Sequence, residues 1–222
     1  MTVLHLADEG EAADLAAFLS RLLHYDRGAA VRLQAAGTAL AVFGRPPSFE
    51  VLAIRAVRLA KPYENGLDVT LDVTVSAGEL LEAVDEAGAT AVVPGAVTGP
   101  PWAGVLPPRG GWRPEPGLPA PDALRSLVAA AVAEFRARTQ ELPEERRTRA
   151  ELDRIGRDIW SRTVGDTRLP VRAVHAAQSL GFLRPGAPPA LFSSGAWLRL
   201  RTPYGSVAVR RAGLGALDVS VR

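Results

Sequence analysis

The residues best suited to hold an anion lie in a stretch rich in proline and glycine, residues 94–121, which contains nine prolines and six glycines. Trp102 and Trp112 are costly to leave in water, and Arg109 lies between them. Two indoles could form the walls of a ligand or partner site, and the guanidinium fork could bind an anionic group. The same residues equally suit a structural strap, whose tryptophans hold it across the junction of the two halves. Both interpretations stay open.

A second set of residues, in the C-terminal half, has spacings that suit contact with nucleic acid. Arg172, His175 and Gln178 recur at a spacing that places them on one face of a helix, from which they could reach base edges or phosphates. Arg199 and Arg201 alternate along a predicted strand, so their side chains share one face. The remaining candidates lie at the following turn and the end of the next strand: Tyr204, Arg210 and Arg211.

Three predicted helices followed by a β-hairpin carry this second set. The stretch LPVRAVHAAQSLGFLRP is the candidate recognition helix, and WLRLRTPYGSVAVRR is the candidate wing. Over residues 121–211 this order resembles the winged-helix DNA-binding domains. The resemblance implies a helix in a DNA groove and a hairpin that contacts phosphates or the minor groove. The structural alternative is an ordinary edge ribbon that its arginines keep soluble.

Motifs of catalysis and metal binding are missing from the sequence. It contains no HExxH, GxSxG, GxxxxGK[ST] or GxGxxG pattern, and none of its histidines stands at a zinc-type spacing with another ligand. We therefore predict no catalytic residues, no metal and no cofactor. An enzyme stays an alternative, because catalytic groups can assemble from distant residues.

Charge is distributed unevenly along the chain. Residues 1–117 carry 14 Asp and Glu against 9 Lys and Arg, a balance of −5, and residues 118–222 carry 10 against 17, a balance of +7, which together give the total of +2. A basic half is typical of a polyanionic partner or of an acidic neighbouring surface. The mixed charges of residues 144–158, in contrast, favour a solvated helix with weak ion pairs.

Composition indicates the compartment. The chain has no cysteine, which excludes disulfides and thiolate chemistry and suits a reducing environment. Its first residues are acidic and lack an apolar signal core, and no apolar run reaches the roughly 18 residues of a membrane span. We expect a cytoplasmic protein with no membrane partner.

Hydrophobic periodicity predicts an α+β protein. The N-terminal part should be a mostly antiparallel sheet with two helices, and the C-terminal part should be helical with a β-hairpin. In the N-terminal part we expect strands at 3–6, 49–59 and 68–75, a hairpin at 31–43, and helices at 12–25 and from Ser76 to a cap at Gly88. In the C-terminal part we expect helices at 124–135, 148–160 and 170–180, and strands at 197–201 and 207–211.

These elements suggest three segments: an acidic domain at 1–93, a linker or strap at 94–121, and a basic domain at 122–222. The favoured function is a non-enzymatic binding protein that contacts nucleic acid through its basic half. One alternative is a protein–protein adaptor or a homodimeric structural module. A second is a small-ligand binder or enzyme that uses the loop of Trp102, Arg109 and Trp112.

Overall fold

The computed structural model describes residues 2–47, 49–63 and 71–211 and confirms the α+β class. Its strands are β1 (Val3–His5), β2 (Ala30–Gly44), β3 (Leu52–Tyr63), β4 (Leu71–Ser76), β5 (Val84–Asp85), β6 (Thr90–Val92), β7 (Arg113–Glu115), β8 (Ala190–Ser194), β9 (Trp197–Thr202) and β10 (Gly205–Arg210). Its helices are α1 (Glu9–Tyr25), α2 (Ala77–Glu82), α3 (Pro121–Gln140), α4 (Arg149–Trp160) and α5 (Val171–Ser179), with short 3-10 turns η1 (Pro101–Gly104) and η2 (Glu144–Arg146).

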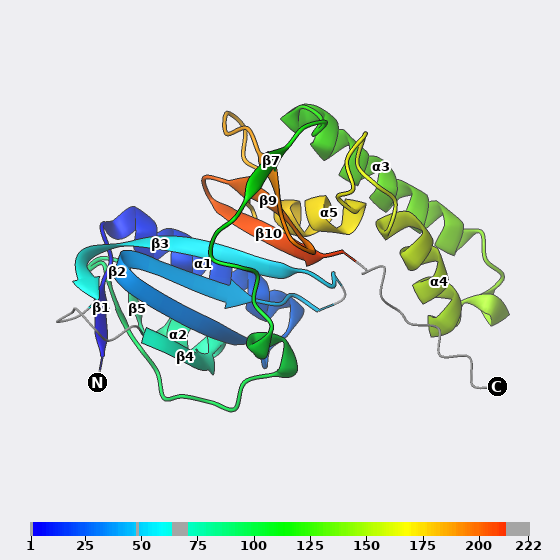
Figure 1. Cartoon of the computed structure of the whole chain (residues 1–222). Helices are drawn as coiled ribbons and strands as arrows, with labels where there is room; N and C mark the ends of the chain where they lie inside the picture. The colour runs from blue at the N-terminus through cyan, green and yellow to red at the C-terminus, as the bar shows by residue number, and fades with distance from the viewer. Residues whose placement is uncertain (1, 48, 64–70, 212–222) are drawn as a thin grey trace, which may run out of the picture.

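The strands form two antiparallel sheets (Figure 1). The larger one has the order β4-β2-β3-β10-β9-β8-β7, and the smaller one has the order β1-β6-β5. Strands from both halves of the chain therefore share the larger sheet. The two halves meet where β10 pairs with β3, with Ser206, Val207 and Ala208 opposite Ile54, Ala53 and Leu52.

Side-chain caps start three of the helices. The Asp8 carboxylate accepts a hydrogen bond from the Glu11 amide at 2.9 Å, and the hydroxyls of Ser76 and Thr148 do the same for α2 and α4. Such caps satisfy amides that have no partner within the helix. The two helix starts predicted at Ser76 and Thr148 are confirmed. The cap predicted at Gly88 is wrong, because α2 ends at Glu82.

The predicted hairpin at residues 31–43 is also wrong, because the segment is one continuous strand, β2. Its first half pairs with β4 and its second half pairs with β3. Gly37, with φ +58°, lies where the register with β3 shifts, so it marks a bulge and not a turn. Because β2 pairs with both β4 and β3, it continues through residues 36–38, whose local sequence is typical of a turn.

The predicted hairpin of β9 and β10 is present, but it is extended on both sides. β10 lies between β9 and β3, and β8 and β7 continue the sheet beyond β9. β8 was not predicted from the sequence, and neither were η1 and β7, which lie within residues 94–121. The strand predicted at 68–75 is present as β4 from Leu71, and residues 68–70 lie outside the described residues.

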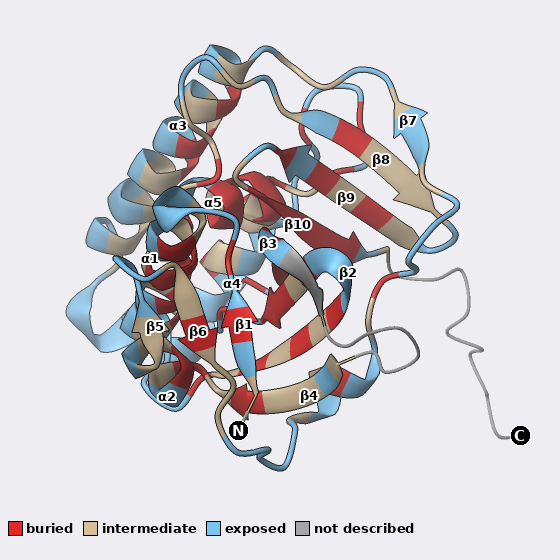
Figure 2. Ribbon diagram, turned by 90° about the vertical axis from the view of Figure 1, so that its left-hand side faces the viewer, coloured by how far each residue is buried: buried red, intermediate tan, exposed pale blue. Residues whose placement is uncertain are grey.

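One face of the larger sheet, the inner face, packs against helices. Side chains of α1, α3, α4 and α5 join those of β2, β3, β9 and β10 in one core that spans both halves. Figure 2 shows buried residues along the strands and the helices that face them. Phe18 of α1 stacks on Phe182, which follows α5, with ring centroids 5.8 Å apart. The halves are thus joined by a shared core as well as by the sheet.

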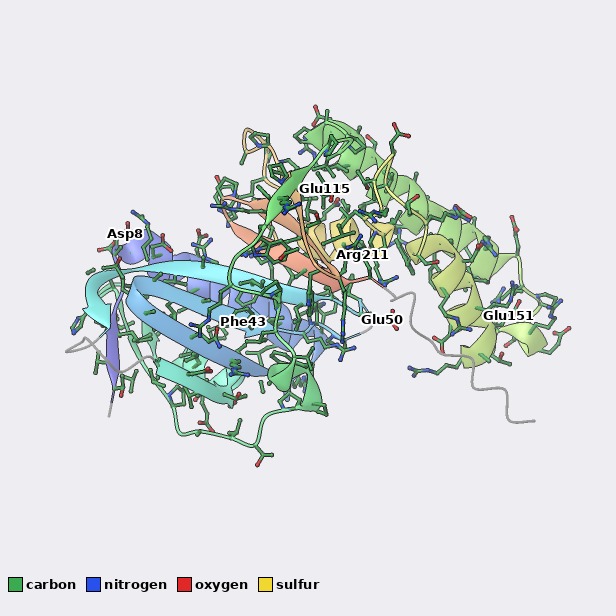
Figure 3. The ribbon with its side chains drawn as sticks, in the orientation of Figure 1. Asp8, Phe43, Glu50, Glu115, Glu151 and Arg211 are labelled. Carbon is green, nitrogen blue, oxygen red and sulfur yellow. The ribbon has the colours of Figure 1, made fainter. Side chains whose placement is uncertain are left out.

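The opposite, outer face of the sheet is crossed by residues 94–112, which we call the strap (Figure 1). Figure 3 shows Phe43 on this face. Beneath the strap lies a second, smaller apolar cluster, made of Phe43, Leu52, Ile54 and Ala208.

None of the helices in the described ranges is long and apolar enough to cross a membrane.

Candidate functional site

The strap is attached to the outer face by packing and by hydrogen bonds. Trp102 packs against the smaller apolar cluster. The Arg32 guanidinium donates to the Ala103 carbonyl and also forms an ion pair with Asp72 at 2.7 Å. The Trp112 indole N–H donates to the Pro108 carbonyl at 3.0 Å, which closes the last turn of the strap on itself. These contacts suit the structural interpretation of residues 94–121.

A cavity lies between the strap and the outer face of the sheet. Its volume is about 250 Å³, it lies between the Pro107–Arg109 segment and strands β2 and β3, and we call it the strap cavity. Small and apolar residues form most of its lining: Ala35, Ala36, Ala39, Ala41, Phe43, Ile54, Ala56, Pro107 and Pro108. Its polar lining residues are Gln34, Arg109 and Arg199. An apolar floor with a few polar groups at its rim is typical of a small-molecule site.

Arg199 is positioned by a hydrogen bond and by an aromatic ring, but no ion pair within the described ranges neutralises its charge. Its Nε–H donates to the Ser206 hydroxyl at 2.9 Å, and its guanidinium carbon lies 5.7 Å from the centre of the Trp112 ring. Burial, with a smaller contribution from the like charge of Arg201, lowers the pKa of Arg199. Within the described residues, no carboxylate lies within 4.0 Å of Arg199 or Arg109. A partly buried cation without a counter-ion is costly, and an anion would offset that cost.

Asp72, whose carboxylate interacts with Arg109 at long range, forms its hydrogen bonds with other residues. Asp72 accepts two hydrogen bonds from Arg32, at 2.7 and 2.8 Å, and one from Gln34 at 3.0 Å. The Arg32 hydrogen bonds are the main cause of its lowered pKa, and Arg109 adds a smaller attraction over a longer distance. Asp72 therefore stays ionised and bound to Arg32, which leaves Arg109 without a direct partner.

The candidate nucleic-acid residues on α5 lie on the inner side of the sheet. His175 stacks on Trp160, with ring centroids 4.6 Å apart, and meets Phe49 edge-to-face at 5.1 Å, and burial lowers its pKa. The Arg172 guanidinium lies 3.8 Å from the Glu50 carboxylate. Gln178 is exposed. His175 thus packs against two aromatic rings on the inner side of the sheet, apart from the arginines of the outer face.

The other predicted residues lie mainly on the outer face or at its edges. Alternation along β9 buries Leu198 and Leu200 in the inner core and turns Arg199 and Arg201 outward, as predicted. Arg210 is exposed at the end of β10. Tyr204 and Arg211 contact neighbouring loops. The Arg184 guanidinium lies 4.0 Å from the centre of the Tyr204 ring, and Arg211 donates a hydrogen bond to the Gly195 carbonyl.

The eight residues predicted for nucleic acid are therefore divided between the two faces. Arg172 and His175 lie with α5 on the inner side, and Arg199, Arg201 and Arg210 lie on the outer side. The hairpin predicted as a wing is part of a wider sheet, with β10 paired on both sides. The winged-helix resemblance is not confirmed.

Charges on α4 and its surroundings form ion pairs, as predicted. Glu151 accepts from Arg154 at 2.6 Å and lies 3.7 Å from Arg146, and Arg149 faces Asp153. Figure 3 shows Glu151 on α4, at the far end of the molecule from β1. This cluster belongs to a solvated helix surface, and its cations are matched by carboxylates.

A buried cluster of ion pairs around Arg55, on the inner side of the sheet, was not predicted from the sequence. Arg55 of β3 is 5% exposed, contacts Glu11 at 3.0 Å and Asp14 at 3.2 Å, and donates to the Tyr204 carbonyl at 2.8 Å. Asp14 also accepts from Arg184 at 2.9 Å. The signal was present, since Arg55 is a charged residue at an inward position in the first, mostly apolar half of its strand.

Among the described residues, no group of three or more His, Asp and Glu side chains could hold a metal ion.

Comparison with known families divides the chain into two parts. Residues 1–104 match the family described as "Domain of unknown function (DUF8010)", and residues 107–214 match the family described as "Domain of unknown function (DUF8185)". No curated protein matches the chain. The boundary between the two matches falls within the strap, between η1 and the segment that lines the strap cavity. The chain is thus similar to one family of unknown function in each half.

Proposed function

We propose that this chain is a non-enzymatic binding protein and that it holds a small amphipathic anion in the strap cavity. The observation that carries the proposal is the lining of that cavity, where Arg109 and Arg199 stand beside an apolar floor with no carboxylate within 4.0 Å among the described residues. The anionic group would lie near the two guanidiniums. The hydrocarbon part would lie on the alanine-rich floor.

The dimensions and chemistry of the cavity limit the ligand. A volume of about 250 Å³ is at the lower end of small-molecule sites, so the ligand is small. Five alanines and Phe43 in the lining leave room for an aliphatic body, and Arg guanidiniums prefer carboxylate or phosphate groups. A medium-chain aliphatic carboxylate meets these requirements.

Isothermal titration calorimetry with octanoate tests the proposal. We expect saturable binding of octanoate and no measurable binding of octan-1-ol, which lacks the charge. Arg199→Gln should weaken octanoate binding by about tenfold or more, since a hydrogen bond to a charged group contributes about 1.5–3 kcal/mol. Arg201→Gln is the matched control, because Arg201 lies on the same face of β9 but does not line the cavity. Equal affinity of the wild-type chain and Arg199→Gln would overturn the proposal.

Nucleic acid is the second candidate, and a specific observation favours it. Three outer-face arginines, Arg199, Arg201 and Arg210, have no carboxylate within 4.0 Å among the described residues. Indoles lie nearby, since Trp112 lies beside Arg199 and Trp197 begins β9. Cations with aromatic side chains are the usual components of single-strand binding surfaces. We propose the outer face, and not α5, as the surface for this function.

Fluorescence anisotropy with a labelled oligothymidylate distinguishes the two candidates. Binding of single-stranded DNA should weaken steeply with salt, and Arg201→Gln should reduce the slope by about 0.7. Under the small-ligand proposal Arg201→Gln has no effect on octanoate. If the chain does not bind the oligonucleotide at low salt, the second candidate fails and the first is unaffected.

A further inference from the structure

The outer face has a second cavity, at the other end of the strap. Its volume is about 350 Å³, and it lies where η1 approaches the ends of β2, β3 and β10. It shares no lining residue with the strap cavity. The lining residues that matter here are Arg45, Glu50, Trp102, Trp197 and Arg210.

The indoles of Trp102 and Trp197 pack on apolar residues and, among the described residues, have no aromatic partner. Trp102 and Trp197 both pack against the smaller apolar cluster of the outer face. Among the described residues neither indole makes a ring–ring contact, whereas Trp160 on the inner side is stacked on His175 at 4.6 Å. An indole that lines a cavity without such a contact can stack on a planar ligand.

The charged groups of the cavity favour a negative group on that ligand. Arg45 and Arg210 are exposed, and in the described ranges neither has a carboxylate within 4.0 Å. Glu50 also lines the cavity and is 71% exposed, and its carboxylate lies 3.8 Å from Arg172. Two cations thus face one carboxylate that is already engaged by a third cation. The remaining acceptor capacity of Glu50 suits an amino group on a ligand ring.

We propose that this cavity binds a nucleoside monophosphate, with its base against Trp102 and Trp197 and its phosphate held by Arg45 and Arg210. A planar base supplies the stacking surface that the indoles lack, and a phosphate matches the guanidinium forks. The exocyclic amino group of adenine or cytosine can donate to Glu50. The site is independent of the strap cavity, which offers no indole to a base.

Calorimetric titration of the full chain with AMP, adenosine and ribose 5-phosphate tests whether both parts of the ligand are needed. We expect AMP to bind with a single-site isotherm, and each half-ligand to bind at least about tenfold more weakly, since base stacking and phosphate contacts each contribute about 1–3 kcal/mol. If ribose 5-phosphate binds as tightly as AMP, the indoles have no role and the proposal is overturned. Failure of AMP to bind overturns it as well.

Matched variants locate the site. Trp197→Leu and Arg210→Gln should each weaken AMP binding by about tenfold. Trp112→Phe and Arg201→Gln are the controls, because both residues lie outside this cavity, and these variants should bind AMP as the wild-type chain does. A loss of AMP binding in Arg199→Gln but not in Arg210→Gln would overturn the assignment, since Arg199 lines only the strap cavity of the two.

Octanoate separates a failure of this site from a failure of the proposed function. Trp197→Leu should bind octanoate with wild-type affinity, because Trp197 does not line the strap cavity. Wild-type octanoate binding by this variant also shows that it is folded, so that a loss of AMP binding reports on the site itself.

Discussion

On the inner face of the larger sheet Arg55 contacts Glu11 and Asp14 of α1, whereas on the outer face Arg199 lies beside Trp112 with no carboxylate within 4.0 Å among the described residues. Both arginines belong to strands of the same sheet, and both are at least partly buried. The inner arginine connects three parts of the fold, because it also donates to the Tyr204 carbonyl. The outer one makes a single hydrogen bond, to Ser206.

The difference shows that the net charge of a half does not reveal which of its cations are available. Many arginines of the basic half are matched by carboxylates, as in the pairs of Arg162 with Glu134 and of Arg184 with Asp14. On the outer face around the strap, five arginines have no carboxylate within 4.0 Å among the described residues: Arg45, Arg109, Arg199, Arg201 and Arg210. Two of these belong to the acidic half of the sequence. The placement of these five arginines on one face, and not the composition of either half, makes the outer face a candidate for anions.

The largest expected effect is on the inner face. Arg55→Leu should lower the free energy of unfolding by about 3–5 kcal/mol, because it leaves the buried Glu11 carboxylate without its closest buried cation. Urea denaturation measures the change. Arg58→Leu is the control, since Arg58 contacts the same Glu11 but its side chain is 71% exposed, and the change in the free energy of unfolding should be much smaller. Equal effects of the two variants would refute the distinction between buried and exposed partners.

A smaller effect is expected where the strap packs on the outer face. Trp102→Ala should lower the free energy of unfolding by about 2 kcal/mol, because the indole covers the smaller apolar cluster while one side stays open. Thermal unfolding measures this change. The fully buried Phe18→Ala is the reference and should cost about 3–5 kcal/mol. A loss at Trp102 as large as that at Phe18 would mean that the strap is part of the main core.

A pH effect is expected on the inner face, at His175. Burial lowers its pKa in the folded chain, so the unfolded chain takes up this proton more readily. Stability is therefore full above the ordinary pKa of 6.5 and declines as the pH falls below it, until the folded pKa is passed. Urea midpoints at about pH 7.5 and about pH 5.5 should differ less in His175→Gln than in the wild-type chain. An unchanged difference would assign the pH dependence to other groups.

The smallest effect on stability is expected at Arg199. Arg199→Gln should change the free energy of unfolding by no more than about 0.5 kcal/mol, because the loss of one hydrogen bond to Ser206 is offset by removing the repulsion from Arg201. The same variant should lose octanoate binding. A clear destabilisation, measured by urea denaturation, would mean that Arg199 is a structural residue like Arg55.

Local signals in the sequence predicted much of the fold, because helix starts and hairpin turns depend on neighbouring residues. The caps at Ser76 and Thr148 and the shared face of Arg199 and Arg201 are of this kind. The segment Ala36–Thr38 resembles a turn, yet pairing with two partner strands extends β2 through it.

The candidate site could be predicted only in part, because it combines residues that are far apart in the sequence. Trp102, Arg109 and Trp112 were chosen as a loop that could bind a ligand, which stays a prediction, but Arg199 joins Arg109 only because β9 lies in the same sheet as β2. In the same way, the predicted wing lies inside a wider sheet only because β10 pairs with β3. No spacing within the second half reveals this pairing, because its partner strand lies in the first half.

That pairing also has a consequence for how the chain is made. Ser206 of β10 lies opposite Ile54 of β3, and the two residues are 152 positions apart (206 minus 54). The ribosome therefore adds about that many residues after Ile54 before β3 can pair with β10. At translation rates of about 5–20 residues per second, this edge of β3 stays open for about 8–30 s on the ribosome. An unpaired apolar strand edge invites association with other nascent chains. We therefore expect nascent chains of this protein to associate more readily before β10 is made than after it has paired with β3.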